Sequence, residues 1–317
     1  MHPRNLSMTM TAVVIWALAF PLIKVALEEV PPITMAFARF AIASAFFLAL
    51  QFTIGGGMPA IRAMDRRTWV LVIAFGVIQS AVTNIAQNIG MQWTSAGVAS
   101  IIQSVGPVFA VFFAIGFLGE RYSHLKMVGG ALAIIGTVGL VIGGGEVPED
   151  ATLLGNFLMV VTAAAYAVGG TIAKYVLKDV DPTTLMAVGT PFALIPLAIG
   201  ASFEETPIEQ LANASWEVWA SIVFLALLAT GVTMILWYRV LARVELSHLA
   251  YFVYLIPVFS VALSWVILEE TIALVQVLFA GLIIAGVAVS QRDGPSSTAA
   301  VVGAGCAEEP GEDEKGP

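Results

Sequence analysis

The chain has little charge and only one cysteine. Charged residues make up 11% of the sequence, against roughly 25% in a typical soluble domain. The single cysteine, Cys306, lies near the C-terminus, so a disulfide within one chain and a cysteine-based metal site are excluded. The three histidines are far apart in the sequence and form no metal-binding motif. We therefore predict neither a bound metal nor a cofactor.

Motifs for enzyme chemistry are also missing. The sequence contains no Ser-His-acid set, no His-Glu-x-x-His run and no phosphate-binding loop, which argues against an enzyme. It contains no selectivity ring, which argues against a channel. The net charge of −8 lacks the basic footprint of a nucleic-acid-binding protein. A membrane enzyme and a channel stay open only as remote alternatives.

Long apolar runs are what the sequence has in abundance. Hydrophobic residues make up 59% of the chain, and runs of about 20 residues match the roughly 30 Å thickness of a bilayer's hydrocarbon core. We predict an all-α integral membrane protein with ten transmembrane helices in contact with the lipid bilayer. The predicted spans are 6–27, 32–54, 68–89, 96–117, 124–143, 154–177, 183–202, 217–238, 246–268 and 272–291.

Basic residues occupy alternate connecting segments. Of the 14 Lys and Arg residues, all but Lys24 and Arg39 lie in the N-terminal segment, the C-terminal segment and every second loop. The remaining loops carry acids, including Glu28, Glu204 and Glu217. Because positive charge is retained on the cytoplasmic side, both termini are predicted to be cytoplasmic in a multi-pass protein of the cell (plasma or inner) membrane.

The chain also repeats itself at a constant offset of 150 residues: Lys24 corresponds to Lys174 and Glu120 to Glu270. Two copies of one unit are therefore expected, covering residues 1–145 and 151–292. Residues 293–317 are acidic and rich in Gly and Pro, which predicts a disordered tail. Five spans in each copy force the second copy to enter the membrane from the opposite side. Inverted repeats of this kind are typical of transporters that work by alternating access.

Charged residues at equivalent places suggest gates. Inversion would bring Lys24 near Glu270 at the outer face and Lys174 near Glu120 at the inner face. We predict two ion pairs between the halves that close alternately, although ordinary interface charges explain the same pattern. Pro107 and Pro257 fall at equivalent mid-span positions and are predicted hinges, since proline removes a backbone hydrogen bond.

Polar and aromatic residues within the spans indicate a solute path. Gln79, Thr83 and Gln87 recur every four residues, as do Ser80, Asn84 and Asn88, so they share one side of a helix. Interhelical hydrogen bonds are the alternative reading of these amides. Trp237 and Tyr238 are expected to be aromatic anchors at the cytoplasmic interface. The predicted substrate-binding residues are Trp16, Phe20, Lys24, Arg39, Thr83, Asn84, Gln87, Gln103, Tyr166, Thr233 and Tyr251.

Several of these residues together resemble a known family. The relevant elements are Trp16, Phe20 and Lys24 at their spacing, Arg39-Phe40, Thr94-Ser95-Ala96, Pro107, Leu118-Gly119-Glu120-Arg121, Pro257 and Glu269-Glu270. In this set the chain resembles the drug/metabolite transporter superfamily, in particular its ten-span group with two EamA domains. Gly189 and Tyr166 depart from the pattern at the places equivalent to Arg39 and Trp16. The resemblance implies a central cavity lined by spans 1, 3, 4, 6, 8 and 9, and export or exchange of amino acids or other metabolites.

We therefore predict a membrane carrier, a permease or exporter, for amino acids or similar small metabolites. No acid lies at mid-membrane, which favours facilitated diffusion; coupling through Lys24, His248 or the gate glutamates stays open. A proton-coupled multidrug or metabolite exchanger of the same superfamily is the main alternative. The expected partners are a small-molecule substrate and the lipid bilayer, and no nucleic acid is expected. The protein is expected to be a monomer or a homodimer, because small residues in spans 5 and 10 suit close helix packing at a dimer face.

Overall fold

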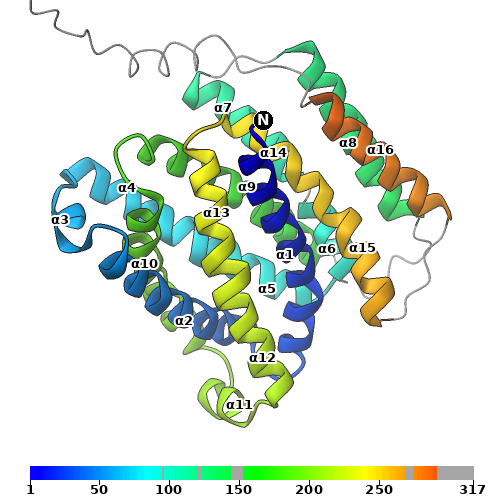
Figure 1. Ribbon diagram of the computed structural model, residues 1–317. Coiled ribbons are helices and arrows are strands. Elements are labelled where there is room, and N and C mark those ends of the chain that lie inside the picture. Colours follow the sequence, from blue (N-terminus) through cyan, green and yellow to red (C-terminus); the bar gives the residue numbers. More distant parts are fainter. Residues whose placement is uncertain (95, 104, 120–122, 144–152, 269–273, 291–317) are drawn as a thin grey trace, which may run out of the picture.

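The computed structural model describes residues 1–94, 96–103, 105–119, 123–143, 153–268 and 274–290, and every regular element in these ranges is helical (Figure 1). The first half comprises α1 (Pro3–Leu27), α2 (Pro32–Thr53), α3 (Gly57–Arg62), α4 (Arg66–Gly76), η1 (Val77–Val82), α5 (Thr83–Gln92), α6 (Ala96–Gln103), α7 (Gly106–Leu118) and α8 (His124–Gly143). The second half comprises α9 (Leu153–Val176), α10 (Pro182–Ala201), α11 (Pro207–Asn213), α12 (Trp216–Phe224), η2 (Leu225–Val232), α13 (Thr233–Leu241), α14 (Leu246–Ala250), η3 (Tyr251–Tyr254), α15 (Leu255–Leu268) and α16 (Leu274–Ser290).

The helices are those of a multi-pass membrane protein. Within the described residues, six helices are long and apolar enough to cross a bilayer. They are Pro3–Leu27, Pro32–Thr53, Arg66–Gln92, Leu154–Val176, Pro182–Ala201 and Trp216–Leu241. The other predicted spans coincide with shorter apolar helices, Gly106–Leu118, His124–Gly136, Leu246–Ser260 and Val277–Val289.

Two of the predicted spans are broken helices. The span expected at 96–117 consists of α6 and α7, and Pro107 lies in the first turn of α7, where its missing N–H removes no helical hydrogen bond. The span expected at 246–268 consists of α14, the 3₁₀ segment η3 and α15, with Pro257 in the first turn of α15. The equivalent prolines of the two halves therefore each follow an interruption of the helix.

Two further spans carry π-helical segments at equivalent places. Segment η1 joins α4 to α5, and η2 joins α12 to α13. At each segment a threonine hydroxyl donates to a carbonyl five residues earlier. Thr83 Oγ1, directly after η1, donates to Ile78 O at 2.8 Å, and Thr230 Oγ1, within η2, donates to Leu225 O at 2.8 Å. Such π segments are rare and occur frequently at functional sites.

The two halves pack against each other through several pairs of helices. Helix α2 packs on α10, and α8 packs on α16 at one edge of the bundle (Figure 1). Helices α5 and α7 contact α9, while α1 contacts α13 and α15. Helices α4 and α10 approach closely, since a methyl group added to Gly76 would overlap the backbone of Gly189. Glycine at position 189, where the first half has Arg39, thus allows two backbones to touch.

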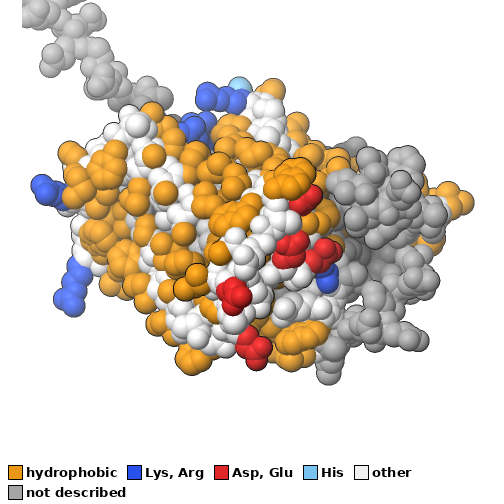
Figure 2. All heavy atoms as spheres, turned by 90° about the horizontal axis from the view of Figure 1, so that it is seen from below, with side chains coloured by type: hydrophobic (Ala, Val, Ile, Leu, Met, Phe, Trp, Pro, Cys, Tyr) orange, Lys and Arg blue, Asp and Glu red, His pale blue; other side chains and the backbone are white. Residues whose placement is uncertain are grey.

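The end of the bundle that carries α11 is acidic. Figure 2 shows Asp and Glu side chains gathered on this face, and Glu28, Glu205, Glu209 and Glu217 are exposed. We call it the acidic end; the opposite basic end exposes Arg4, Arg62, Arg66, Arg67, Lys178 and Arg243.

Carboxylates join the two halves at the acidic end. The Glu29 carboxylate accepts hydrogen bonds from Ser215 N at 2.6 Å and from Ser215 Oγ at 2.7 Å. These bonds favour the charged form and hold the pKa of Glu29 below its ordinary value. Glu204 caps the start of α2 in the same manner, accepting from Ile33 N at 2.7 Å and Thr34 N at 2.8 Å. Each contact anchors one half to a helix N-terminus of the other.

Candidate functional site: a cavity between the halves

A cavity of about 120 Å³ lies between the two halves. It is bounded by α1, α2, η1, α5, α6 and α7 of the first half and by α9, α13, α14, η3 and α15 of the second. Many lining residues are equivalent pairs at the 150-residue offset: Trp16 with Tyr166, Phe20 with Gly170, Gln87 with Trp237, Gln103 with Val253, and Gly106 with Ile256. The same positions of both repeats therefore face one space.

The two walls of this cavity differ in chemistry. The guanidinium and all three side-chain amides come from the first half, on Arg39, Gln79, Gln87 and Gln103. The second half contributes apolar and aromatic side chains, among them Met234, Trp237, Tyr238, Val253 and Ile256, and Trp16 of the first half packs against Trp237 on this side. A solute with one polar end and one apolar end would find a matching wall for each.

Arg39 is the charged residue of the polar wall. Its side chain is only 4% exposed, and its Nε donates to Thr230 Oγ1 at 2.8 Å, on η2 of the other half. Its Nη1 donates to Asn84 Oδ1 at 3.3 Å, and Asn84 in turn donates to Ser80 O at 3.0 Å. No carboxylate of the described residues lies within ion-pair distance of Arg39. A buried cation without a counter-ion is costly, so the site is poised to receive an anion.

Two tryptophans close the aromatic side. The rings of Trp16 and Trp237 lie 4.8 Å apart between centroids and are tilted by 56°. Trp16 Nε1 also donates to Ala229 O at 2.9 Å, a carbonyl within η2. This hydrogen bond fixes the indole of α1 on the π segment of the other half, so the aromatic wall is positioned by packing and by a polar contact.

Six of the predicted substrate-binding residues line the cavity: Trp16, Phe20, Arg39, Gln87, Gln103 and Tyr166. The other five lie outside its lining, and for four of them the structure gives the reason. Thr83 and Thr233 donate to carbonyls of their own span, Ile78 O and Ala229 O. Asn84 is bound to Arg39, and Tyr251 OH donates to Lys126 O at 2.7 Å. Lys24 is partly buried in the last turn of α1.

The sequence analysis did not select Trp237, Tyr238 or Gln79 as binding residues, although all three line the cavity. Trp237 and Tyr238 were expected at the membrane interface, but they are 8% and 2% exposed and face the cavity. The repeat contained the signal for Trp237, because its equivalent, Gln87, was already assigned to the path. Gln79 was placed on the polar stripe but not selected as a binding residue, and it lines the cavity.

The predicted gates fall largely outside the described residues. Glu120 and Glu270 both lie there, so neither ion pair is seen. The described contacts of Lys174 are with the end of α13: its Nζ donates to Leu241 O at 2.8 Å and to Val244 O at 2.7 Å. A lysine at this position complements the unpaired carbonyls and the negative dipole of a helix C-terminus.

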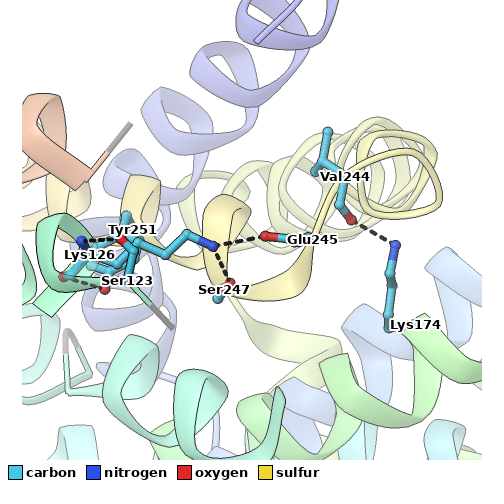
Figure 3. A network of polar contacts seen from close by, with 7 residues as sticks. All are labelled: Ser123, Lys126, Lys174, Val244, Glu245, Ser247 and Tyr251. Carbon is cyan, nitrogen blue, oxygen red and sulfur yellow. Dashed lines mark hydrogen bonds and ion pairs between the residues drawn. The ribbon is translucent and has the colours of Figure 1, made fainter. Parts of the chain in front are cut away.

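A second lysine, Lys126, binds the other end of the loop between α13 and α14 (Figure 3). Lys126 Nζ lies 2.8 Å from Glu245 Oε2 and 3.2 Å from Ser247 Oγ, at the start of α14. The side chains of Lys126 and Glu245 are 3% and 10% exposed. Leu246 and Ala250 of α14 line the cavity, so this network anchors a helix that forms one of its walls. The sequence analysis did not select Lys126 or Glu245.

A helical membrane bundle with an amphipathic cavity between two equivalent halves has the architecture of a solute transporter. Comparison with known sequences agrees. The chain belongs to the EamA-like transporter family, which it matches over residues 4–142 and 153–291.

Its relatives are similar over nearly their full length. An uncharacterized transporter of Archaeoglobus fulgidus is 30% identical over 280 residues, which cover 88% of this chain and 96% of that protein. A probable amino-acid metabolite efflux pump of Escherichia coli is 28% identical, covering 89% and 93%. A probable terminal-alkyne amino-acid exporter of Streptantibioticus cattleyicolor is 27% identical, covering 88% and 91%. A solved structure described as "Crystal structure of protein" shares the fold, with a TM-score of 0.72 at 18% identity over 94% of this chain and 98% of that one.

Proposed function

We propose that this transporter carries amino acids or similar small amphipathic metabolites across the cell membrane by alternating access. The observation that carries the proposal is the division of the cavity into a polar wall with Arg39 and three glutamines and an apolar wall with Trp237 and Met234. A carboxylate would pair with Arg39, which has no described counter-ion. The printed names of two relatives, an amino-acid exporter and an amino-acid metabolite efflux pump, point to the same class of solute.

The size of the cavity favours a small metabolite over a drug. Its volume of about 120 Å³ is below the roughly 300–1,000 Å³ typical of sites for drug-sized ligands. This supports the amino-acid reading over the multidrug exchanger. No Asp or Glu is among the described lining residues, which supports facilitated transport over proton exchange.

We further propose ten spans in two inverted five-span repeats, over residues 1–145 and 151–292, with the basic end and both termini in the cytoplasm. The matching order of elements, the equivalent π segments and the equivalent interrupted spans support two copies of one unit. The charge difference between the ends supports the orientation, because basic loops stay on the cytoplasmic side. A monomer contains the whole cavity, so transport in this proposal needs no second chain.

The inner closure in this mechanism is the network around the loop between α13 and α14. Lys126 and Glu245 join the halves at the basic end, and α14 beyond them forms part of the cavity wall. Breaking the pair would free α14 to move away from α8. The short α14 is separated from α15 by the 3₁₀ segment η3, a place where a helix can bend with few hydrogen bonds lost.

Counterflow in proteoliposomes tests the function. Vesicles loaded with a panel of unlabelled amino acids and other metabolites are diluted into the labelled solute, with protein-free vesicles as the control. We expect saturable, counterflow-stimulated uptake for at least one amphipathic amino acid, unaffected by a protonophore. Uptake that does not saturate would indicate a channel, and uptake that collapses with the proton gradient at a fixed solute gradient would indicate proton exchange.

A further inference from the structure

A second hollow, a groove of about 480 Å³, lies at the basic end of the molecule. Its first wall comes from α3 and the start of α4, in the first half. Its second wall comes from the end of α9, the start of α10 and the loop between them. Figure 1 shows α3, α4 and α10 together at one side of the bundle. No described residue lines both this groove and the central cavity, so the groove is a separate place for a ligand.

The groove carries charges of both signs that do not pair with one another. Arg67 lies on the first wall, and Asp179 and Asp181 lie on the second. All three side chains are exposed, and in the described part of the chain no ion pair includes any of them. The Cζ atom of Arg67 instead lies 5.1 Å from the ring centre of Tyr175. A ligand with one negative and one positive group would therefore find a partner for each.

The carboxylates of the groove differ in what they already bind. Asp65 caps α4 by accepting from Thr68 N at 2.9 Å, and Asp181 caps α10 by accepting from Thr183 N at 2.7 Å. The side chain of Asp179 has no hydrogen-bond partner among the described residues. Asp179 is thus the carboxylate most available to a donor on a ligand, and the second oxygen of Asp181 is available beside it.

The groove lies where the membrane-spanning helices end. Its walls include the first residues of the apolar helix Arg66–Gln92, the end of Leu154–Val176 and the start of Pro182–Ala201. The ends of such helices lie among the lipid headgroups. Tyr175 is 36% exposed there, a place typical of an interfacial aromatic residue. A lipid headgroup is therefore the charged molecule that this groove meets at the highest local concentration.

We infer that this groove binds the headgroup of an aminophospholipid, phosphatidylethanolamine. Its ammonium group, with three N–H donors, pairs with Asp179 and Asp181, and its phosphate pairs with Arg67. Phosphatidylcholine has the same phosphate, but methyl groups replace its N–H donors. Phosphatidylglycerol has the phosphate and no cation. The aspartates therefore determine which lipid is preferred, and Arg67 contributes to binding of any phospholipid.

Native mass spectrometry of the purified full-length protein tests this inference, with three lipids of identical acyl chains. We expect the wild type to bind phosphatidylethanolamine about three- to five-fold more tightly than phosphatidylcholine or phosphatidylglycerol, as exposed charge pairs imply. Asp179→Asn should lower this preference without changing the binding of phosphatidylcholine. Arg67→Met should weaken both of these lipids, because both contain the phosphate. Arg243→Met removes an exposed guanidinium outside the groove and should bind as the wild type does.

Three results would overturn the inference: equal binding of phosphatidylethanolamine and phosphatidylcholine by the wild type, tighter binding of phosphatidylglycerol, or an unchanged preference in Asp179→Asn. O-phosphoethanolamine, the soluble headgroup alone, distinguishes a lipid from a dissolved metabolite. At the same concentration as the lipid it should leave bound phosphatidylethanolamine in place, and displacement would overturn the assignment to a lipid. The inference stands apart from the solute of the central cavity, so a wild type that transports no amino acid would overturn the proposed function alone.

Discussion

The ammonium group of Lys126 lies 2.8 Å from the carboxylate of Glu245, and this buried ion pair joins α8 of the first half to the start of α14 in the second. Removing one partner of a buried pair leaves the other charge unpaired, at a cost of up to about 3–5 kcal/mol. We therefore expect Lys126→Met and Glu245→Gln each to lower the melting temperature in detergent. The double variant, which buries no unpaired charge, should recover part of the loss.

If the same pair closes the inner end of the cavity, breaking it should expose the cavity to the cytoplasm. Replacing Cys306 by serine gives a chain without cysteine, into which a cysteine can be placed at Ala250, a lining residue that is 4% exposed. In Lys126→Met this cysteine should react several-fold faster with an impermeant maleimide applied at the basic end. A cysteine at the exposed Ala242 is the control. Equal rates at Ala250 with and without Lys126 would show that the pair is not part of a gate.

The sequence predicted most of the helices and part of the cavity. Apolar runs locate the spans because crossing hydrocarbon requires about 20 apolar residues. Periodicity put Gln79 and Gln87 on one polar stripe, and both residues line the cavity. The sequence analysis failed at Trp237, because an amphipathic indole ring suits a membrane interface and a binding pocket equally well. Only the packing of α13 on α1 distinguishes the two places. The sequence analysis also missed Lys126. A lysine at the end of a span is explained by the excess of positive charge on the cytoplasmic side, and its ion pair with a residue 119 positions away is known only from the structure.

The role of Arg39 gives a further prediction. Loss of a hydrogen-bonded pair with a carboxylate costs about 1.5–3 kcal/mol, so Arg39→Met should weaken leucine binding roughly 10- to 100-fold. L-leucine methyl ester, which has no carboxylate, should bind the wild type and Arg39→Met about equally. Calorimetry with both ligands measures this. Arg62→Met removes an exposed guanidinium at the basic end and serves as the control. Unchanged leucine affinity in Arg39→Met would exclude Arg39 as the carboxylate partner.

The contact between Gly76 and Gly189 gives a prediction about stability. An added methyl group at Gly76 would overlap backbone atoms of α10, which cannot rotate away, so Gly76→Ala must separate two packed helices. We expect a loss of about 1–3 kcal/mol, seen as a lower melting temperature and poorer yield in detergent. Gly116→Ala is the matched control, because a methyl group there would meet no atom within 4 Å. A melting temperature of Gly76→Ala equal to that of Gly116→Ala would refute the tight contact.

The contact of Glu29 with Ser215 gives a prediction about pH. The two hydrogen bonds from Ser215 lower the pKa of Glu29, so the folded state prefers the charged carboxylate. The contact therefore stabilises the fold above the unfolded pKa of about 4.3, and this contribution is lost as the pH falls through the lower folded-state value. The difference in melting temperature between wild type and Glu29→Gln should be constant from neutral pH down to about 5 and should shrink in more acidic buffer.

Ser215→Ala should reproduce that behaviour from the other side of the contact, since it removes one of the two donors and the N-cap of α12. Glu28→Gln removes another exposed charge one residue earlier and controls for the general effect of net charge at the acidic end. Because Glu29 is fully exposed to water, the differences should be small, and differential scanning fluorimetry on paired samples at each pH is the suitable measurement. If the stability difference for Glu29→Gln persisted unchanged to the lowest pH, the carboxylate's charge would not be what holds the first half to the start of α12.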